Sequence, residues 1–274
     1  MTDSVDIQPA AAHKAPLSLR NPVMVAAGCY GLGDAYAELV DAARLGAVVV
    51  GPVTLRPRRG GAPPRAVPVS GGVLVHTGLE NPGLSSVLRH HRRAWSRSPA
   101  PVILHLAATT PERTSIACER LSAEDAVAAV ELGLANHVTA GEAAGLVEAA
   151  AHMYPYRPLL VRLPLETAAD LAEPVVTAGA DALVVAAPPR GTVHFRGQFV
   201  TGRLYGPFVL PLALRAIRRV ADRVRVPLVG AGGISTVGDA RTVLRSGAVA
   251  IQVDVVLWRD PAGLGPLAEE TASD

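Results

Sequence analysis

Eight short, mainly apolar runs recur along this chain, and stretches with helical periodicity separate them. Runs that are apolar throughout, rather than alternating, are typical of parallel strands buried on both faces. A chain with eight such strands has few ways to bury all of its apolar surface. The predicted strands are Pro22–Ala26, Ala47–Val50, Val102–Leu106, Ala128–Leu132, Leu159–Leu163, Ala182–Ala186, Pro227–Gly230 and Ala248–Val253.

The stretches between these runs predict helices, and several end in a Gly-Ala pair, as at Gly46, Gly179 and Gly247. Glycine after the last helical turn supplies the left-handed cap residue. The alternation of eight strands with helices predicts an α/β fold, a (β/α)8 TIM barrel, with a doubly wound open sheet as the alternative. The predicted helices are Asp34–Leu45, Gly83–Trp95, Ser122–Ala126, Gly141–Met153, Thr167–Ala178, Val209–Val220 and Thr236–Ser246.

The length of 274 residues suits one such barrel, which we expect to span residues 17–274. Residues 1–16 are polar and rich in Pro and Ala, and we expect a flexible N-terminal tail there.

Composition argues against several functional classes. A net charge of +2 gives no electrostatic footprint for nucleic acid. We find no signal segment and no apolar run of 18 residues, so we expect a cytoplasmic protein without membrane association. Lys14 is the only lysine, which excludes Schiff-base chemistry inside the predicted barrel. Cys29 and Cys118 are too few for a disulfide framework, and no metal-ligand spacing is present.

Two long connections and one glycine-rich turn are candidates for ligand binding. Gly51–Gly72 and Pro188–Gly206 follow predicted strands, so both are expected on the carboxyl face, where barrel active sites form. The turn Val229–Ile234 (VGAGGI) ends a strand and precedes a helix. Such glycines let the backbone approach a phosphate, and the helix amino end favours the anion. A tight turn without a ligand is the alternative.

Several motifs resemble those of class 1 dihydroorotate dehydrogenases, from about Leu17 to Pro261. They are NPVMVAAGCYGLG at Asn21–Gly33, TLRPRRGGAPPR at Thr54–Arg65, SGG and GLENPG within Ser70–Gly83, GRLYGP at Gly202–Pro207, and VGAGGI at Val229–Ile234. The resemblance implies an FMN-binding (β/α)8 barrel, usually dimeric, that oxidises dihydroorotate to orotate.

The same resemblance implies a catalytic Cys base, but Asn136 stands at that position and cannot accept a proton. Losing a buried polar partner commonly costs about 1–3 kcal/mol, so joint losses should abolish recognition of orotate. We therefore expect no oxidation of dihydroorotate. The other Lys or Asn positions of the family pattern that are lost here are Gly51, Val75, Gly133, Val138 and Ala187.

Other family positions keep a possible role in binding. Arg162 stands where a lysine contacts the flavin, and His105 replaces the Asn after the third strand. Asp254 falls near the flavin phosphate, which its carboxylate would repel unless it turned away or paired with an arginine. The residues expected to bind FMN are Ala27, Gly28, His105, Arg162, Gly206, Gly232, Gly233 and Asp254. The residues expected to bind substrate are Thr77, Gly78 and Leu79, through their amides, and Arg203.

Histidines near strand ends are the candidates for a replacement base, because histidine titrates near neutrality. His137, next to the lost Cys position, is the first choice, and Asn136 and Tyr205 complete the expected catalytic set. Each histidine could instead be a packed or solvated residue. The other histidines near predicted strand ends are His76, His105 and His194.

Three functions follow from these observations. The first is a repurposed FMN-dependent oxidoreductase that does not act on dihydroorotate. The second is a non-catalytic family member that serves as a scaffold or as the partner of an active protein. The third is a flavin-free barrel that uses His and Arg on a small anionic molecule. The family pattern also implies a homodimer.

Overall fold

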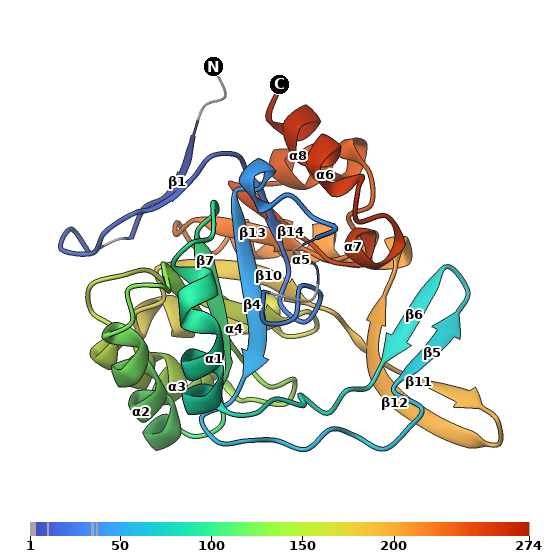
Figure 1. Cartoon of the computed structure of the whole chain (residues 1–274), viewed down its shortest axis with the longest axis horizontal. Helices are drawn as coiled ribbons and strands as arrows, with labels where there is room; N and C mark the ends of the chain where they lie inside the picture. Colours follow the sequence, from blue (N-terminus) through green and yellow to red (C-terminus); the bar gives the residue numbers. More distant parts are fainter. Residues whose placement is uncertain (1–3, 10, 34–35, 37, 274) are drawn as a thin grey trace.

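A computed structural model describes residues 4–9, 11–33, 36 and 38–273. Eight parallel strands close into a barrel that runs β3, β4, β7, β8, β9, β10, β13, β14 and back to β3 (Figure 1). This confirms the predicted (β/α)8 barrel, with a strand at each predicted run. The strands are β3 Val23–Val25, β4 Ala47–Val53, β7 Val102–Ala107, β8 Ala129–Gly133, β9 Leu159–Pro164, β10 Ala182–Ala187, β13 Leu228–Ala231 and β14 Ala250–Val253.

Five predicted helices are confirmed within a few residues. They are α1 Leu84–Trp95, α3 Ala140–Met153, α4 Ala168–Thr177, α5 Leu210–Ala221 and α6 Val237–Arg245. Thr139 and Thr236 begin α3 and α6 with capping boxes, because each hydroxyl accepts from the third helical amide and an acidic side chain bonds back. Two further helices, α7 Val255–Arg259 and α8 Leu264–Ala272, were not predicted from the sequence.

Two other helix predictions need correction. The helix predicted at Ser122–Ala126 is wrong, since helix α2 covers Pro111–Ser122 and ends where that prediction begins. Its start follows the usual rules, with Thr110 as N-cap, Pro at the first turn and Glu112 after it. In the range Asp34–Leu45, residues 34, 35 and 37 lie outside the described residues, and Ala42–Arg44 forms a single 3-10 turn (η1).

The two long connections are not merely loops, because together they build a second sheet. Its strand order is β11, β12, β6, β5, all antiparallel, and it projects from one side of the barrel (Figure 1). Leu74 pairs with Leu204 across the β6–β12 junction, and Val67, Leu74 and Val200 form its small core. The strands are β5 Ala66–Val69, β6 Gly72–Val75, β11 Arg190–Phe195 and β12 Gln198–Tyr205.

The segment predicted to be a flexible tail contributes the floor of the barrel. Strand β1 (Val5–Ile7) pairs antiparallel with β2 (Leu17–Leu19), and Ile7 is completely buried against the inner barrel layer. The amine of Lys14 lies 2.5 Å from the carboxylate of Asp181. This packing arises because the amino-terminal end of a barrel leaves apolar side chains that need a cover.

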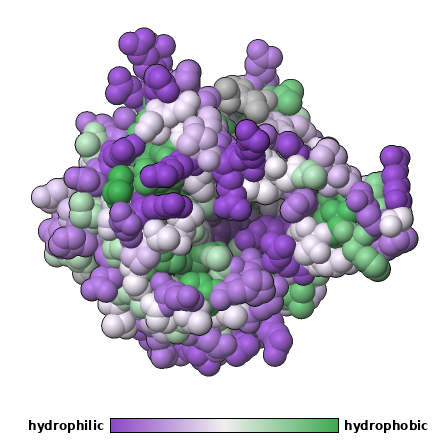
Figure 2. Space-filling model, turned by 90° about the horizontal axis from the view of Figure 1, so that it is seen from below, coloured by the Kyte–Doolittle hydropathy of each residue, from purple (hydrophilic) through white to green (hydrophobic). Residues whose placement is uncertain are grey.

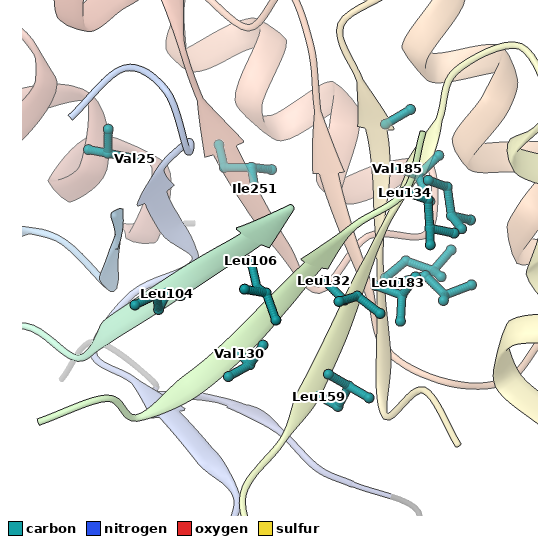
Figure 3. Close-up of a cluster of buried hydrophobic side chains, with 14 of the residues drawn as sticks. Val25, Leu104, Leu106, Val130, Leu132, Leu134, Leu159, Leu183, Val185 and Ile251 are labelled. Atoms are coloured by element: carbon teal, nitrogen blue, oxygen red, sulfur yellow. The ribbon is translucent and has the colours of Figure 1, made fainter. Parts of the chain in front are cut away.

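Strand alternation divides the barrel side chains into two sets. Outward-facing residues pack under the helices, and Figure 3 shows Leu104, Leu106, Leu132, Leu183 and their neighbours in this layer. Inward-facing residues fill the lower barrel with small and branched apolar side chains such as Ile103 and Ala129. Four inward positions nearer the carboxyl ends are polar instead: His105, Glu131, Arg162 and Gln252.

Candidate active site at the barrel mouth

A cavity of about 510 Å³ opens at the carboxyl ends of the strands, a volume that suits a small molecule. Figure 2 shows this face, where hydrophilic residues surround a hollow near the middle. Strand ends form its floor, and the second sheet forms one wall. The residues that line the cavity include Ala27, Gly28, Arg58, His76, Thr77, Gly78, Leu79, His105, Gly133, Arg162, Arg190, Arg203, Tyr205 and Trp258.

A buried polar network underlies the floor. The Glu131 side chain has no exposed surface, and its carboxylate lies 2.6 Å from Nδ1 of His105 and 3.4 Å from Nη1 of Arg162. Nε2 of Gln252 donates to the other carboxylate oxygen, and Nη1 of Arg162 donates to Gln252 at 2.6 Å. Burial alone would raise the pKa of Glu131, but Arg162, His105 and Gln252 together lower that pKa to about 2. Glu131 is therefore ionised at neutral pH.

The walls of the cavity are strongly cationic. Four arginines and two histidines line it, and none of the described lining residues carries a carboxylate. Arg190 and Arg203 stand directly opposite each other on β11 and β12. Burial, together with Arg162 and Arg190 nearby, lowers the pKa of Arg203. Concentrating positive charge in this way destabilises the free protein and favours an anion in the cavity.

Hydrogen bonds hold two of these arginines in place. Nη1 of Arg203 donates to the carbonyl of Pro188 at 2.7 Å, and Nη2 donates to Oδ1 of Asn136 at 3.0 Å. Nε of Arg58 donates to the carbonyl of Gly78 at 2.8 Å. The residues expected to bind substrate, Thr77, Gly78, Leu79 and Arg203, all line this one cavity.

The expected catalytic residues are only partly brought together. His137 is exposed and does not line the cavity. Asn136 bridges Arg203 and Glu166, with its Nδ2 3.4 Å from the Glu166 carboxylate, so it positions the arginine. Tyr205 lines the cavity, but its ring packs edge-on against Trp258 at 5.0 Å, and burial raises the pKa of its hydroxyl.

The other histidines divide in the same way. His76 and His105 line the cavity, whereas His194 packs against Phe199 in the β11–β12 hairpin, with ring centroids 5.3 Å apart and the rings tilted by 59°. The structure thus places two of the four histidines where a ligand could meet them.

The expected phosphate-side residues Gly206, Gly232, Gly233 and Asp254 lie apart from the cavity lining. A Cβ at Gly233 would overlap the backbone of Leu210, at the start of α5, so this glycine permits close packing of helix against turn. The Asp254 side chain is buried, and its carboxylate accepts from the amide of Val255 at 2.5 Å, which caps α7. The Asp254 carboxylate therefore bonds to the first amide of α7, at the position where the family resemblance places the flavin phosphate.

Comparison with known proteins decides the family. A model of the dihydroorotate dehydrogenase family matches residues 11–270. The chain belongs to the dihydroorotate dehydrogenase family. It is 33% identical, over 262 residues, to the catalytic subunit of dihydroorotate dehydrogenase B (NAD(+)) from Listeria welshimeri, covering 89% of this chain and 86% of the relative. The protein of the same name from Geotalea uraniireducens is 32% identical over 272 residues, covering 93% and 89%.

Members of the dihydroorotate dehydrogenase family are FMN-dependent, and this chain fits that cofactor at one end only. Ala27, Gly28, His105 and Arg162, the residues expected beside the flavin ring, line the cavity. At the phosphate end, the Asp254 carboxylate already caps α7, and α7 carries Trp258 against Tyr205. A phosphate at that helix end would face a buried carboxylate that has no arginine hydrogen-bonded to it, so these residues do not fit FMN in the expected position.

Four residues in or beneath the cavity were not identified from the sequence as site residues. Glu131 and Gln252 are polar residues inside apolar strands, and their parity with other inward-facing positions was a usable signal. Arg190 was noted only as part of a long loop, and Trp258 lies in a helix that was not predicted.

In the described part of the chain, no three His, Cys, Asp or Glu side chains gather closely enough to hold a metal ion. None of the helices within the described ranges is long and apolar enough to cross a lipid bilayer.

Proposed function

We propose that this member of the dihydroorotate dehydrogenase family binds a small anionic molecule at the barrel mouth and does not oxidise dihydroorotate. The observation that carries the proposal is the charge of the cavity lining. Glu131 beneath the floor pairs with Arg162 and His105, whereas Arg58, Arg190 and Arg203 have no ion pair with a carboxylate among the described residues. A ligand with a carboxylate or phosphate group would supply the missing negative charge.

The loss of dihydroorotate oxidation is supported by what replaces the family's base. Asn136 accepts a hydrogen bond from Arg203 and lies beside Glu166, so it holds the arginine and offers no proton acceptor of suitable pKa. Gly51, Val75 and Ala187 add no polar group in place of the family's Lys and Asn side chains.

Of the three functions considered, the flavin-free barrel acting on an anion has the best support. The flavin oxidoreductase retains support from Arg162 and Gly28, at the ring end of the cavity. Asp254 opposes it at the expected phosphate position, because its carboxylate already bonds to the amide of Val255. The homodimer, a partner protein and a cytoplasmic location stay predictions from the family resemblance and the sequence.

Two measurements test the proposal. The first is the visible absorption spectrum of the purified protein before and after adding FMN, together with an assay for dihydroorotate oxidation using quinone, fumarate or NAD(+) as acceptor. We expect a colourless protein, no flavin retained after gel filtration and no turnover. Stoichiometric flavin would restore the oxidoreductase hypothesis, and turnover of dihydroorotate would overturn our proposal.

The second measurement is the shift in melting temperature with inorganic phosphate, and separately with pyruvate as a carboxylate probe. A ligand at 100 times its Kd stabilises a protein by about 2.7 kcal/mol. We expect stabilisation by at least one probe, and its loss in Arg203→Gln, while the hairpin-tip variant Arg196→Gln keeps it. Equal stabilisation in both variants, or none in the unmodified protein, would contradict anion binding in this cavity.

A further inference from the structure

Of the two histidines that line the cavity, His105 forms a close contact with a buried carboxylate, that of Glu131. It follows the inward-facing Ile103 on β7, and its register partner on β8 is Glu131. Nδ1 of His105 lies 2.6 Å from Oε1 of Glu131, while the His105 side chain keeps 11% of its surface exposed and lines the cavity. Because Glu131 is ionised, Nδ1 carries the proton and donates to it. The lone pair of the neutral imidazole is then on Nε2, at the opposite edge of the ring.

Gly133 is what makes room for that edge of the ring. A Cβ at position 133 would overlap both Nε2 and Cε1 of His105, and Gly133 itself lines the cavity. The family pattern has Asn at both positions 105 and 133. The two changes are therefore sterically coupled, since the His105 ring occupies space that any side chain at 133 would need.

Glu131 cannot easily turn away from His105. One carboxylate oxygen is shared by His105 and Arg162, and Gln252 donates to the other. Gln252 also accepts from Arg162, so the carboxylate is held from β9 and β14 at once. A carboxylate fixed in this way sets the tautomer and orientation of the imidazole and stabilises its protonated form.

We propose that His105 is the acid–base group of the cavity and that Glu131 is its positioning residue. This inference rests on the proposed binding of an anion at the barrel mouth. His105 Nε2 takes a proton from a carbon next to a carbonyl or carboxylate of the bound anion. The C–H bond breaks, its electron pair moves into the adjacent C=O, and the cavity arginines stabilise the resulting oxyanion. Return of the same proton to a different carbon of the delocalised anion completes a redox-neutral isomerisation, in which no group leaves the ligand.

Modification of histidines by diethyl pyrocarbonate, followed by peptide mass spectrometry over a range of pH, tests this pair. The exposed His137 serves as an internal reference in the same sample. In Glu131→Gln we expect modification of His105 to extend to lower pH, because the carboxylate 2.6 Å from Nδ1 is replaced by a neutral amide. The pH dependence of His137 modification should not change. The charged groups on the elements around His105 are Glu131, Arg162, His76, Arg58, Arg190 and Arg203.

Gly133→Ala is a second variant that leaves Glu131 and its charge in place. The added methyl group should displace the imidazole and reduce His105 modification at least several-fold, with an unchanged circular dichroism spectrum. Gly141→Ala, on α3, where an added Cβ meets no atom within 4 Å, is the matched control and should behave like the unmodified protein.

The outcomes separate the two proposals. Two results would overturn the acid–base pair. One is that His105 stays unmodified while His137 reacts. The other is that Glu131→Gln leaves the pH dependence of His105 modification unchanged. Inorganic phosphate should slow modification of His105 but not of His137. If His105 modification responds to Glu131→Gln as expected but neither phosphate nor pyruvate protects His105, the contact between His105 and Glu131 is supported, while anion binding in the cavity and the proton transfer that depends on it are refuted.

Discussion

At the scale of single residues, two buried or capping aspartates should respond to pH in opposite senses. Burial raises the pKa of Asp254, whereas hydrogen bonds from Ser235 and Thr236 outweigh burial and lower the pKa of Asp239. A carboxyl with a raised folded-state pKa loses stabilising effect as pH rises through that pKa. A carboxyl with a lowered pKa stabilises the fold above its unfolded-state pKa and loses this effect as pH falls.

Asp254→Asn should therefore raise the melting temperature at pH 8 by a few degrees, because Asn removes the buried charge and remains a good N-cap. The gain should vanish below about pH 4, where the aspartate is protonated in both states. Asp239→Asn is the control and should lower the melting temperature at neutral pH. Thermal melts across this pH range give the answer, and a gain in Asp254→Asn that persists in acid would show that its charge is not the cause.

At the scale of secondary-structure elements, the β11–β12 hairpin places Arg190 against Arg203. Like charges directly opposite on paired strands cost roughly 0.2–1 kcal/mol. Arg190→Gln should therefore raise the melting temperature by about 1–3 °C in buffer without multivalent anions. The same variant should respond less to inorganic phosphate than the unmodified protein.

Arg196→Gln provides the matched control for this hairpin, because Arg196 lies in its turn and faces no arginine across the strands. Differential scanning fluorimetry with and without phosphate distinguishes the variants. A stability gain in Arg196→Gln equal to that in Arg190→Gln would mean that net charge, rather than the cross-strand pair, is responsible.

At the scale of the whole molecule, the N-terminal segment closes the barrel floor and is tied to it by an ion pair. Both side chains of the Lys14–Asp181 pair are nearly buried, at 7% and 5% exposure. The same Asp181 oxygen accepts from the amide of Leu159 on β9 at 2.8 Å. Removing one partner of a buried pair leaves an uncompensated charge and costs about 3–5 kcal/mol.

Lys14→Met should accordingly lower the free energy of unfolding by about 3 kcal/mol, measured by urea denaturation. The double variant Lys14→Met/Asp181→Asn should recover part of the loss, because no unpaired charge remains. A deletion of residues 1–16 should destabilise at least as much as Lys14→Met, since it also removes Ile7 from the inner layer. A truncated protein as stable as the full chain would restore the prediction of a flexible tail.

The sequence by itself determined the barrel and its family. A strand buried on both faces needs apolar residues along its whole length in any fold. Each apolar run is therefore a local signal, and all eight barrel strands were predictable. Helix α2 was missed although Thr110 and Pro111 signalled its start. The family motifs likewise lie within short contiguous segments, and the family match over residues 11–270 confirms what they indicated.

Only the tertiary structure decided which polar side chains share the cavity. The sequence made His137 the first choice for a base, but the His137 side chain is exposed to solvent, whereas His105 lines the cavity and contacts Glu131. Side chains on a strand alternate between two faces, so a one-residue difference in register or strand end reverses where each points. The second sheet, too, pairs segments over 120 residues apart, Leu74 with Leu204, and no local pattern encodes such a pairing. Arg190 and Arg203 owe their place at the cavity wall to that pairing.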